Sequence, residues 1–316
     1  MRLLGVDIGG TKCAVSIGEY VDGNIAILNK IKTETDLKIS PEIMLERLCR
    51  LADELLDGSK PERIGVSCGG PLNSQTGRIQ GPPNLPGWTD VAVVDLFEQH
   101  YGVPAHLQND ANACAVAEWK FGAGKGLNNL IFLTFGTGLG AGLILNGQLY
   151  AGTTDMAGEV GHIRLENYGP VGYGKCGSFE GFCSGGGLAQ IGYTLALEAT
   201  QNGNRPLYFL EGMTADEVNA KAIADAAEQG DETAIKAYRM CGEYLGRGLS
   251  ILLDILDPEA IVIGSIFTRS EELLRETMDA AIRREALSVA AAHCRVLPAA
   301  LGESLGDYAA LSIALL

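Results

Sequence analysis

Apolar residues in this chain recur at two spacings, and the two spacings alternate along the sequence. Short uninterrupted apolar runs are typical of buried strands, whereas apolar residues three or four positions apart are typical of one face of a helix. Ser40 and Pro41, for example, form a helix start, and apolar residues from Met44 to Leu55 then recur at helical spacing until Gly58. The predicted order is strand–turn–strand at 3–17, helix 41–57, strand 64–67, helix 94–99, strand 105–108, helix 109–119, strand–turn–strand at 131–145, helix 235–255, strand 261–264 and helix 306–316.

This order of strands and helices is typical of an α/β fold. The segment 68–90 interrupts it, because Pro, Gly and Asn are frequent there and no regular spacing is present. We predict a long loop at this place, and long ordered loops are more often functional than idle.

The turn after the first strand combines glycines with polar residues. Gly9 and Gly10 allow backbone amides to approach a polyphosphate closely. Thr11 and Lys12 add a hydroxyl donor and a positive charge, and Asp7 at the strand end is placed to hold Mg²⁺ or its water shell. A single glycine turn is more often a plain hairpin, so this motif alone is weak evidence for a nucleotide site.

The segment 131–145 repeats the strand, glycine turn and strand of 3–17. Two hairpins of this kind, each opening an α/β unit, suggest a duplicated fold that binds one nucleotide with both halves. The repeat therefore strengthens the nucleotide hypothesis.

Composition limits the possible partners. The chain has 316 residues, 47% hydrophobic content, mean hydropathy +0.12 and a formal net charge of −15 with a pI near 4.7. This length and hydropathy predict a globular protein of two domains. The negative charge argues against nucleic acid or an anionic membrane as a partner, because phosphate groups would be repelled.

Several features favour the cytoplasm. The eight cysteines, at 13, 49, 68, 114, 176, 183, 241 and 294, are scattered without paired spacings, which suggests reduced thiols. Met1 and Arg2 lead directly into a strand, so we expect no signal peptide. The uncharged stretch 127–154 is broken by six glycines and does not look like a membrane helix.

Taken in order, these and further motifs resemble the ROK family of sugar kinases and sugar-responsive repressors, within the actin-like ATPase superfamily. The resemblance covers nearly the whole chain and rests on seven ordered segments. These segments are 7–12, 65–72, 83–88, Asn109-Asp110, 136–140, 159–162 and 257–264.

The resemblance implies two actin-like, ribonuclease H-like α/β domains around a central cleft. The smaller domain would comprise 1–117, with the C-terminal helix 303–316 packed back on it, and the larger domain would comprise 118–302. Sugar binding would draw the domains together and exclude water from the reaction.

The resemblance also implies a mechanism. Asp110 would be the general base that removes a proton from a sugar hydroxyl as it attacks the γ-phosphate of ATP. Taken alone, Asp110 is equally a favoured helix cap, and a helix N-terminus would keep its carboxylate ionised. The implied sugar ligands are Gly70, Asn84, Asn109, Asp110, Glu159, His162 and Glu180.

The implied nucleotide site uses both glycine turns and a third, C-terminal turn. ATP and Mg²⁺ would be bound by Asp7, Gly9, Gly10, Thr11, Lys12, Gly136, Thr137, Gly138, Gly264 and Ser265. Ser265 stands where the family usually has a second glycine, which bears on how closely the backbone can approach the adenosine. A homodimer would be usual for the family.

The chain departs from the family at a zinc motif. Many members combine the histidine at 162 with a Cys-x-Cys-Gly-x-x-Gly-Cys-x-Glu run, but Val171, Tyr173 and Ser178 occupy those cysteine positions here. One histidine cannot supply the four ligands of structural zinc. We therefore expect no structural zinc, and we expect Val171, Tyr173, Phe179 and Phe182 to pack the loop as an apolar cluster.

Three functional classes are compared. A sugar kinase accounts for Asp110 and both hairpins; a repressor of the same family would need a helix-turn-helix ahead of Asp7, and a non-catalytic actin-like protein would not need the sugar residues. Glucose is the first substrate candidate. N-acetylmannosamine and N-acetylglucosamine are next, because Gly69-Gly70 replaces the more usual Pro-Gly, as in N-acetylmannosamine kinases, and fructose or allose follow.

Overall fold

A computed structural model describes all 316 residues, which form two compact units. The first unit comprises Met1–Phe132, Gly142–Gly158 and Ala300–Leu316, and the second comprises Leu133–Ala141 and Glu159–Ala299. The division falls inside two adjacent strands, and the boundary predicted at 117 lies within helix α3. Each unit is described in turn.

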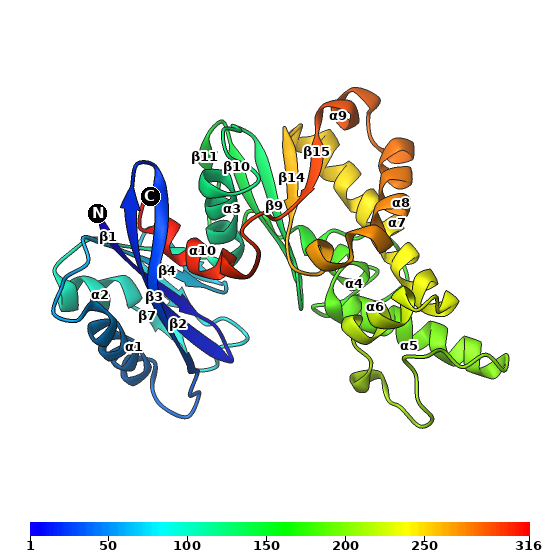
Figure 1. The fold of residues 1–316 in the computed structure, drawn as a ribbon, viewed down its shortest axis with the longest axis horizontal. Helices are drawn as coiled ribbons and strands as arrows, with labels where there is room; N and C mark the ends of the chain where they lie inside the picture. The colour runs from blue at the N-terminus through cyan, green and yellow to red at the C-terminus, as the bar shows by residue number, and fades with distance from the viewer. The chain divides into compact units, whose positions relative to one another are not determined.

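The first unit contains a five-stranded sheet of order β3-β2-β1-β4-β8 (Figure 1). β1 pairs antiparallel with β2 and parallel with β4, and β4 pairs parallel with β8. The strands are β1 (Arg2–Ile8), β2 (Lys12–Val21), β3 (Asn24–Glu34), β4 (Arg63–Cys68) and β8 (Ala105–Asn109). The helices are α1 (Pro41–Leu56), α2 (Val93–Tyr101), α3 (Asp110–Phe121) and α10 (Leu305–Ile313), with a short 3₁₀ turn η3 (Gly302–Ser304) before α10.

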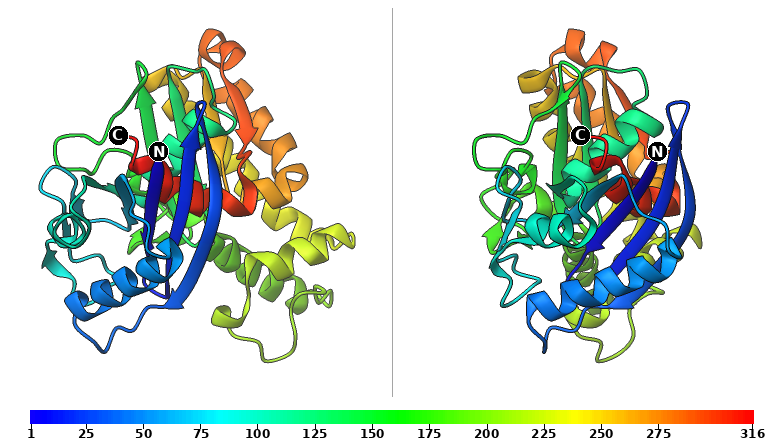
Figure 2. Two further views of the ribbon diagram at one scale, coloured as in Figure 1. Left: turned by 60° about the vertical axis from the view of Figure 1, so that its left-hand side comes forward. Right: turned by 90° about the vertical axis from the view of Figure 1, so that its left-hand side faces the viewer.

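Side-chain alternation along β1 explains how both faces of this sheet are covered (Figure 2). Leu4, which is fully buried, belongs to the core that includes the apolar face of α1. Leu3 points to the other face and packs with Leu311 of α10. The C-terminal helix therefore lies on β1 and β4 (Figure 1), and Lys30 Nζ holds it by a 2.7 Å ion pair to Asp307.

The predicted long loop at 68–90 contains a small sheet of its own. Its strands, in the order β5-β6-β7, are β5 (Leu72–Asn73), β6 (Arg78–Gln80) and β7 (Thr89–Val91). Leu85 and Trp88 are buried in the core of the unit, and Ser74 donates a 2.6 Å hydrogen bond to Asp155. Short strands of two or three residues produce too weak a periodic signal to be found from sequence.

The second sheet has the order β11-β10-β9-β14-β15 (Figure 1); β14 and β15 belong to the second unit, whereas β11 belongs to the first. The long helix α7 contacts α5, α6 and α8. The strands are β9 (Leu130–Phe135), β10 (Leu139–Leu145), β11 (Gln148–Leu149), β14 (Ala260–Ile263) and β15 (Arg295–Pro298), with a separate hairpin of β12 (Val171–Gly172) and β13 (Lys175–Cys176). The helices are α4 (Phe179–Phe182), α5 (Gly185–Gln201), α6 (Ala220–Glu228), α7 (Glu232–Leu256), α8 (Ile266–Glu285) and α9 (Ser288–His293), with 3₁₀ turns η1 (Val160–His162) and η2 (Ala215–Glu217).

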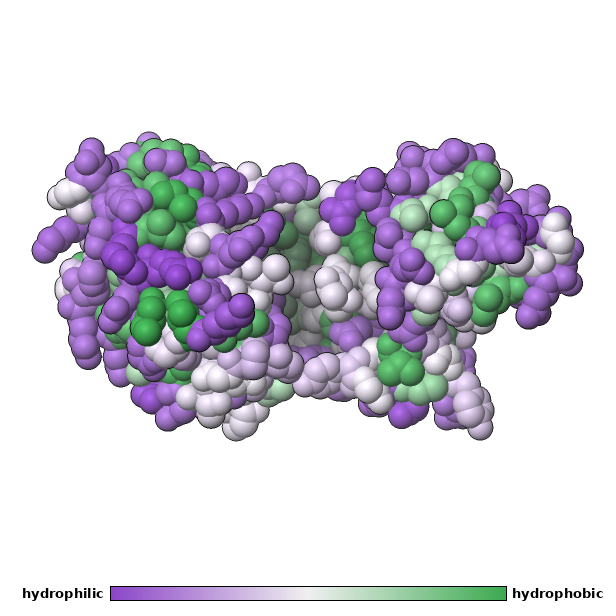
Figure 3. All heavy atoms as spheres, turned by 90° about the horizontal axis from the view of Figure 1, so that it is seen from below, coloured by the Kyte–Doolittle hydropathy of each residue, from purple (hydrophilic) through white to green (hydrophobic).

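The face shown in Figure 3 is mainly hydrophilic, in line with the high net charge of the chain, which is −15. No helix is both long enough and apolar enough to cross a membrane.

Candidate active site

The predicted site residues of the first unit gather at the carboxyl ends of three neighbouring parallel strands. Ile8 of β1 stands opposite Cys68 of β4, and Cys68 stands opposite Asn109 of β8. The strand ends are therefore level, and the turns that follow them share one edge of the sheet. Open α/β sheets bind ligands at this edge.

The first glycine turn packs directly against the loop that carries Asn84. A Cβ atom on Gly10 would lie only 2.3 Å from the carbonyl oxygen of Asn84, so no other residue fits without moving the backbone. Gly9 N donates to Lys12 O at 3.2 Å, and Thr35 donates to Gly9 O at 2.6 Å. Thr35 was not identified from sequence, because it directly follows β3, far from the motif along the chain.

Asp7 lies at the end of β1 and is largely shielded from water. The pKa of Asp7 is raised from 3.8 to about 6, mainly by burial and then by the nearby carboxylates of Asp110 and Asp307. A hydrogen bond with Ser67 and the charge of Lys32 act in the opposite direction. A shielded carboxylate next to a second one is a site at which a cation would be stabilised.

Asn109 and Asp110 form the junction between β8 and α3. Asn109 is the N-cap, and its side chain accepts a hydrogen bond from Ala111 N at 2.9 Å, while Asp110 Oδ1 accepts from the same amide at 2.8 Å. Gly70 lies beside them, since a Cβ on it would stand 3.3 Å from Asn109 Nδ2. The cap is thus Asn109 rather than Asp110.

The electrostatics of Asp110 differ in part from the sequence-based expectation. Its side chain reaches solvent, yet it is surrounded by densely packed protein atoms, and this desolvation raises the pKa of its carboxyl group above 3.8. Hydrogen bonds from the amides of Ala111 and of Asp110 itself oppose the rise. The helix N-terminus acts in the predicted direction, but desolvation is the larger effect.

In the second unit, the turn Gly136–Gly138 joins β9 to β10 and is held from several sides. Gly136 O accepts a hydrogen bond from Gly185 N at 2.7 Å, and Gly140 N donates to the Thr134 hydroxyl at 2.9 Å. Gly185 opens α5, whose N-cap is Ser184. Sequence reasoning missed this contact, although the run Ser184–Gly187, a capping residue followed by three glycines, was a usable signal.

Glu159, His162 and Glu180 lie at two short segments near this turn, η1 and α4. Glu159 directly precedes the short turn η1 and His162 is its last residue; both side chains are exposed. Glu180 lies in the first turn of α4, and its Oε2 accepts a hydrogen bond from Leu139 N at 3.0 Å. These three predicted sugar ligands therefore all belong to the second unit.

Ser265 has a glycine-like backbone conformation. Its φ of 58° and ψ of −109° lie outside the regions that side chains favour, and its hydroxyl faces the turn, because a Cβ on Gly136 would lie 3.5 Å from Ser265 Oγ. Gly264 N donates to Leu133 O at 3.0 Å. The third predicted nucleotide segment thus borders the second glycine turn.

The loop at the zinc-motif positions is held by ordinary side-chain and backbone contacts. No group of three or more His, Cys, Asp or Glu side chains gathers in the protein in a way that could hold a metal ion. Gln190 accepts from Val171 N and donates to Val171 O, both at 2.9 Å. Arg247 forms a 2.7 Å ion pair with Glu166.

The expected four-residue apolar cluster in this loop is wrong. Phe179 and Phe182 are buried, but Val171 is 46% and Tyr173 is 68% exposed. Phe182 stacks instead on Tyr244 of α7, with ring centroids 3.6 Å apart. The β12–β13 hairpin turns its side chains outward, and apolarity alone did not reveal that direction.

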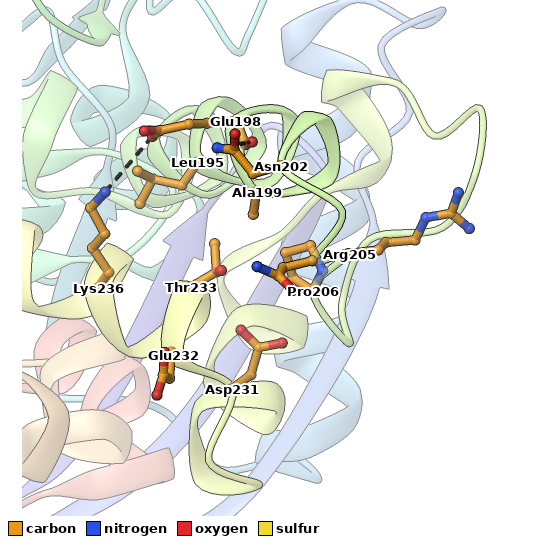
Figure 4. A pocket seen from close by; sticks show the side chains of 11 residues that line it. Leu195, Glu198, Ala199, Asn202, Arg205, Pro206, Asp231, Glu232, Thr233 and Lys236 are labelled. Atoms are coloured by element: carbon orange, nitrogen blue, oxygen red, sulfur yellow. Dashed lines mark hydrogen bonds and ion pairs between the residues drawn. The ribbon is translucent and has the colours of Figure 1, made fainter.

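A pocket of about 520 Å³ lies elsewhere in the second unit, between the end of α5 and the start of α7 (Figure 4). None of the predicted site residues lines it. Its cations are already paired, Lys236 with Glu198 at 3.7 Å and Arg205 with Glu211 at 3.3 Å. Asp231 caps α7 and accepts from Leu207 N at 2.6 Å. The pocket therefore offers no unpaired charge to a phosphate.

Comparison with known proteins identifies the family. The ROK family model matches residues 3–315. The chain belongs to the ROK family. It is 33% identical over 282 residues to a glucokinase of Streptomyces coelicolor, a match that covers 89% of this chain and 87% of that one.

Solved structures agree with this assignment. A ROK family glucokinase from Streptomyces griseus, in complex with glucose and AMPPNP, is 32% identical with a TM-score of 0.79, over 100% of this chain and 99% of that one. A ROK hexokinase from Thermus thermophilus is 30% identical with a TM-score of 0.79, over 100% and 98% of the two chains. The likeness confirms the predicted class of two actin-like α/β domains.

Proposed function

We propose that this ATP-dependent hexose kinase phosphorylates the 6-hydroxyl of glucose, with Asp110 as the general base. Family membership and the similarity to glucokinases support a kinase that acts on a hexose. The observation that carries the proposal is the position of Asp110 directly after β8, level with the ends of β1 and β4. Its carboxylate is at the binding edge of the sheet and reaches solvent.

Asp110 has the geometry of a positioned base. One oxygen, Oδ1, is fixed by Ala111 N at 2.8 Å, which orients the carboxylate and leaves Oδ2 for the sugar hydroxyl. Desolvation raises the pKa of Asp110, so its carboxylate is a stronger base than one in water. The proton passes from the hydroxyl oxygen to Asp110 as that oxygen bonds to the γ-phosphorus, and ADP leaves with the electrons of the broken P–O bond.

The remaining proposed ligands orient the sugar. Asn109 offers an amide group next to Gly70 and Asn84 offers one next to Gly69, and the absence of side chains on the two glycines leaves room for a ring. Glu159, His162 and Glu180 of the second unit would bind further hydroxyls. Carboxylate, imidazole and amide groups form directional hydrogen bonds, which hold a hydroxyl in line with the phosphate.

The proposed nucleotide ligands are backbone-rich. Gly9, Gly10, Gly136 and Gly138 keep side chains out of the two turns, so that phosphates can approach the backbone closely. Thr11, Lys12 and Thr137 would add polar groups, and Gly264 and Ser265 would contact the adenosine. Asp7 fits a magnesium ion, because its carboxylate is shielded from water and lies near that of Asp110, and a cation would offset both charges. Bound Mg²⁺ supplies neutralisation of phosphate charge.

A kinase for N-acetylmannosamine or N-acetylglucosamine is the second candidate. Gly69 is the observation that favours it, since this position, whose Cβ would stand 3.6 Å from Asn84 Oδ1, has no side chain beside a proposed sugar ligand. An N-acetyl group needs more room than a hydroxyl.

One assay tests the proposal. The protein is given ATP, Mg²⁺ and a panel of hexoses and N-acetylhexosamines, and ADP release is coupled to a visible reaction. We expect glucose to have the highest kcat/KM, and Asp110→Asn to lower kcat by about 10³-fold or more with little change in sugar affinity. Asp57→Asn, at the exposed end of α1, is the matched control. Near-normal turnover of Asp110→Asn would refute the base assignment.

A further inference from the structure

Glu180 connects the loop of proposed sugar ligands to the second glycine turn. Its Oε2 accepts a hydrogen bond from the backbone amide of Leu139, the first residue of β10, at 3.0 Å. A carboxylate that accepts from an amide forms a charge-assisted hydrogen bond, which is stronger than one between neutral groups. One side chain thus joins a loop residue to the hairpin that is proposed to bind phosphate.

The neighbouring backbone is shaped to admit this contact. A Cβ on Gly138 would lie 2.8 Å from Glu180 Oε2, so the carboxylate occupies the space that any other residue would need. On the other side, a Cβ on Gly161 would lie 2.3 Å from Leu139 O and 3.2 Å from Glu180 Cβ. The segment that carries His162 therefore packs on both partners.

The rest of α4 keeps Glu180 in place. Ser178 caps the helix by accepting from Gly181 N at 3.1 Å, and Phe179, which is fully buried, fills the space above Gly248 of α7. The backbone of Glu180 is therefore fixed independently of its carboxylate. A change at the carboxylate acts on the hairpin rather than on the helix.

We propose that Glu180 is a positioning residue for the nucleotide: it holds the Leu139 amide, and so the Gly136–Gly138 turn, in the conformation that binds ATP. The part of this proposal that concerns the sugar rests on the proposed function, in which Glu180 binds a sugar hydroxyl. Because Glu180 would bind a sugar hydroxyl with its other oxygen, the sugar and the nucleotide share one carboxylate. Occupation by either ligand then orders the side chain for the other, and the two bind cooperatively.

The first test measures binding of a non-hydrolysable ATP analogue by calorimetry, without sugar. Glu180→Ala removes the acceptor, and we expect its Kd for the analogue to rise about tenfold, in line with the loss of one charge-assisted hydrogen bond. Glu180→Gln keeps an oxygen that can accept from Leu139, so we expect its Kd to stay within about threefold of the native value. Glu228→Ala, at an exposed glutamate of α6 in the same unit, is the matched control and should leave this Kd unchanged.

A second readout reports directly on the turn. Hydrogen–deuterium exchange of a peptide that spans 136–140 should become faster in Glu180→Ala and stay slow in Glu180→Gln and Glu228→Ala. Saturating glucose should slow exchange of this peptide in the native protein. Equal nucleotide affinity and equal exchange in Glu180→Ala and the native protein would overturn the proposal.

A reciprocal variant guards against a failure of Glu180→Ala to fold. Gly138→Ala places a methyl group against the carboxylate, so we expect it to weaken glucose binding about fivefold in the absence of nucleotide. Unchanged glucose affinity in Gly138→Ala would contradict the coupling. If the native protein binds no hexose, the proposed function fails, whereas the sugar-free nucleotide measurements still decide the role of Glu180.

Discussion

The carboxylate of Glu118, near the end of α3, accepts a hydrogen bond from the backbone amide of Leu301 at 2.9 Å. Its other oxygen accepts from Ala123 N at 2.8 Å and Ala300 N at 3.2 Å. The side chain is fully buried. A single carboxylate therefore satisfies three amides at the points where the chain leaves α3 and where it returns ahead of α10.

Glu118→Ala should destabilise the protein strongly. It leaves three backbone amides without their acceptor, and each buried unsatisfied donor costs about 1–3 kcal/mol, so we expect a loss of about 3 kcal/mol or more. The free energy of unfolding from urea titration measures this. Glu54→Ala, at an exposed position of α1, is the control and should change it by less than about 0.5 kcal/mol. A similar small effect at Glu118 would contradict the role assigned to it.

Asp7 should make stability depend on pH. Its pKa is raised from 3.8 to about 6 in the folded protein, so the folded state holds this proton more tightly. The stabilisation from protonated Asp7 is fully present below pH 3.8 and is lost as the pH rises through about 6. Two pKa units correspond to about 3 kcal/mol, less where water reaches the group.

Asp7→Asn is the corresponding variant. We expect it to raise the free energy of unfolding by about 1–3 kcal/mol at about pH 8 and to change it little at about pH 4. Under the proposed function, the variant should lose kinase activity although it is more stable, and native kcat/KM should fall below about pH 6. Denaturant titrations at both pH values and a pH–rate profile test this. A stability difference that is independent of pH would count against the assignment.

Ser265→Gly should stabilise the protein. A serine at φ 58° and ψ −109° is strained, and strain of this kind costs on the order of 1–3 kcal/mol. Glycine adopts such angles readily, so we expect a gain of about 1 kcal/mol after its greater freedom in the unfolded chain is subtracted. Ser265→Ala keeps the strain and loses only the hydroxyl, and it should give no gain. Thermal unfolding compares the three proteins.

Metal analysis should find no zinc in the purified protein. The residues at the three family cysteine positions are not thiols, and no set of three ligand side chains gathers in the structure. A chelator should accordingly leave the unfolding temperature unchanged. One zinc per chain by atomic absorption would overturn this expectation.

Gln190→Ala should loosen the loop that lacks zinc. The Gln190 amide forms two 2.9 Å hydrogen bonds to the backbone of Val171, which anchor the β12–β13 hairpin to α5. Under the proposed function we expect a severalfold rise in KM for the sugar, with KM for ATP little changed. Thr194→Ala, one turn further along α5, is the control. Equal effects on both KM values would show that the loop does not act on the sugar alone.

The local sequence pattern was sufficient to predict many of the helices and strands. Ser40, Pro41 and Gly58 delimit α1 because caps and stops depend on residues next to one another. Strands such as β4 and β14 were predictable because most residues of a buried strand are apolar and follow one another without polar alternation. The short strands β5, β6 and β7 were not, since two or three residues are too few to show a periodic pattern.

The sequence by itself determined which chemistry is available: glycines at two turns, Asp7 at the end of one strand and Asn109-Asp110 at the end of another, all of them local arrangements of residue types. Tertiary structure decided how these groups meet. The register that levels Ile8, Cys68 and Asn109, the aim of Glu180 at Leu139 and the outward direction of Tyr173 depend on contacts between segments distant along the chain. Periodicity and capping residues do not predict such contacts, because the packing of the whole chain establishes them.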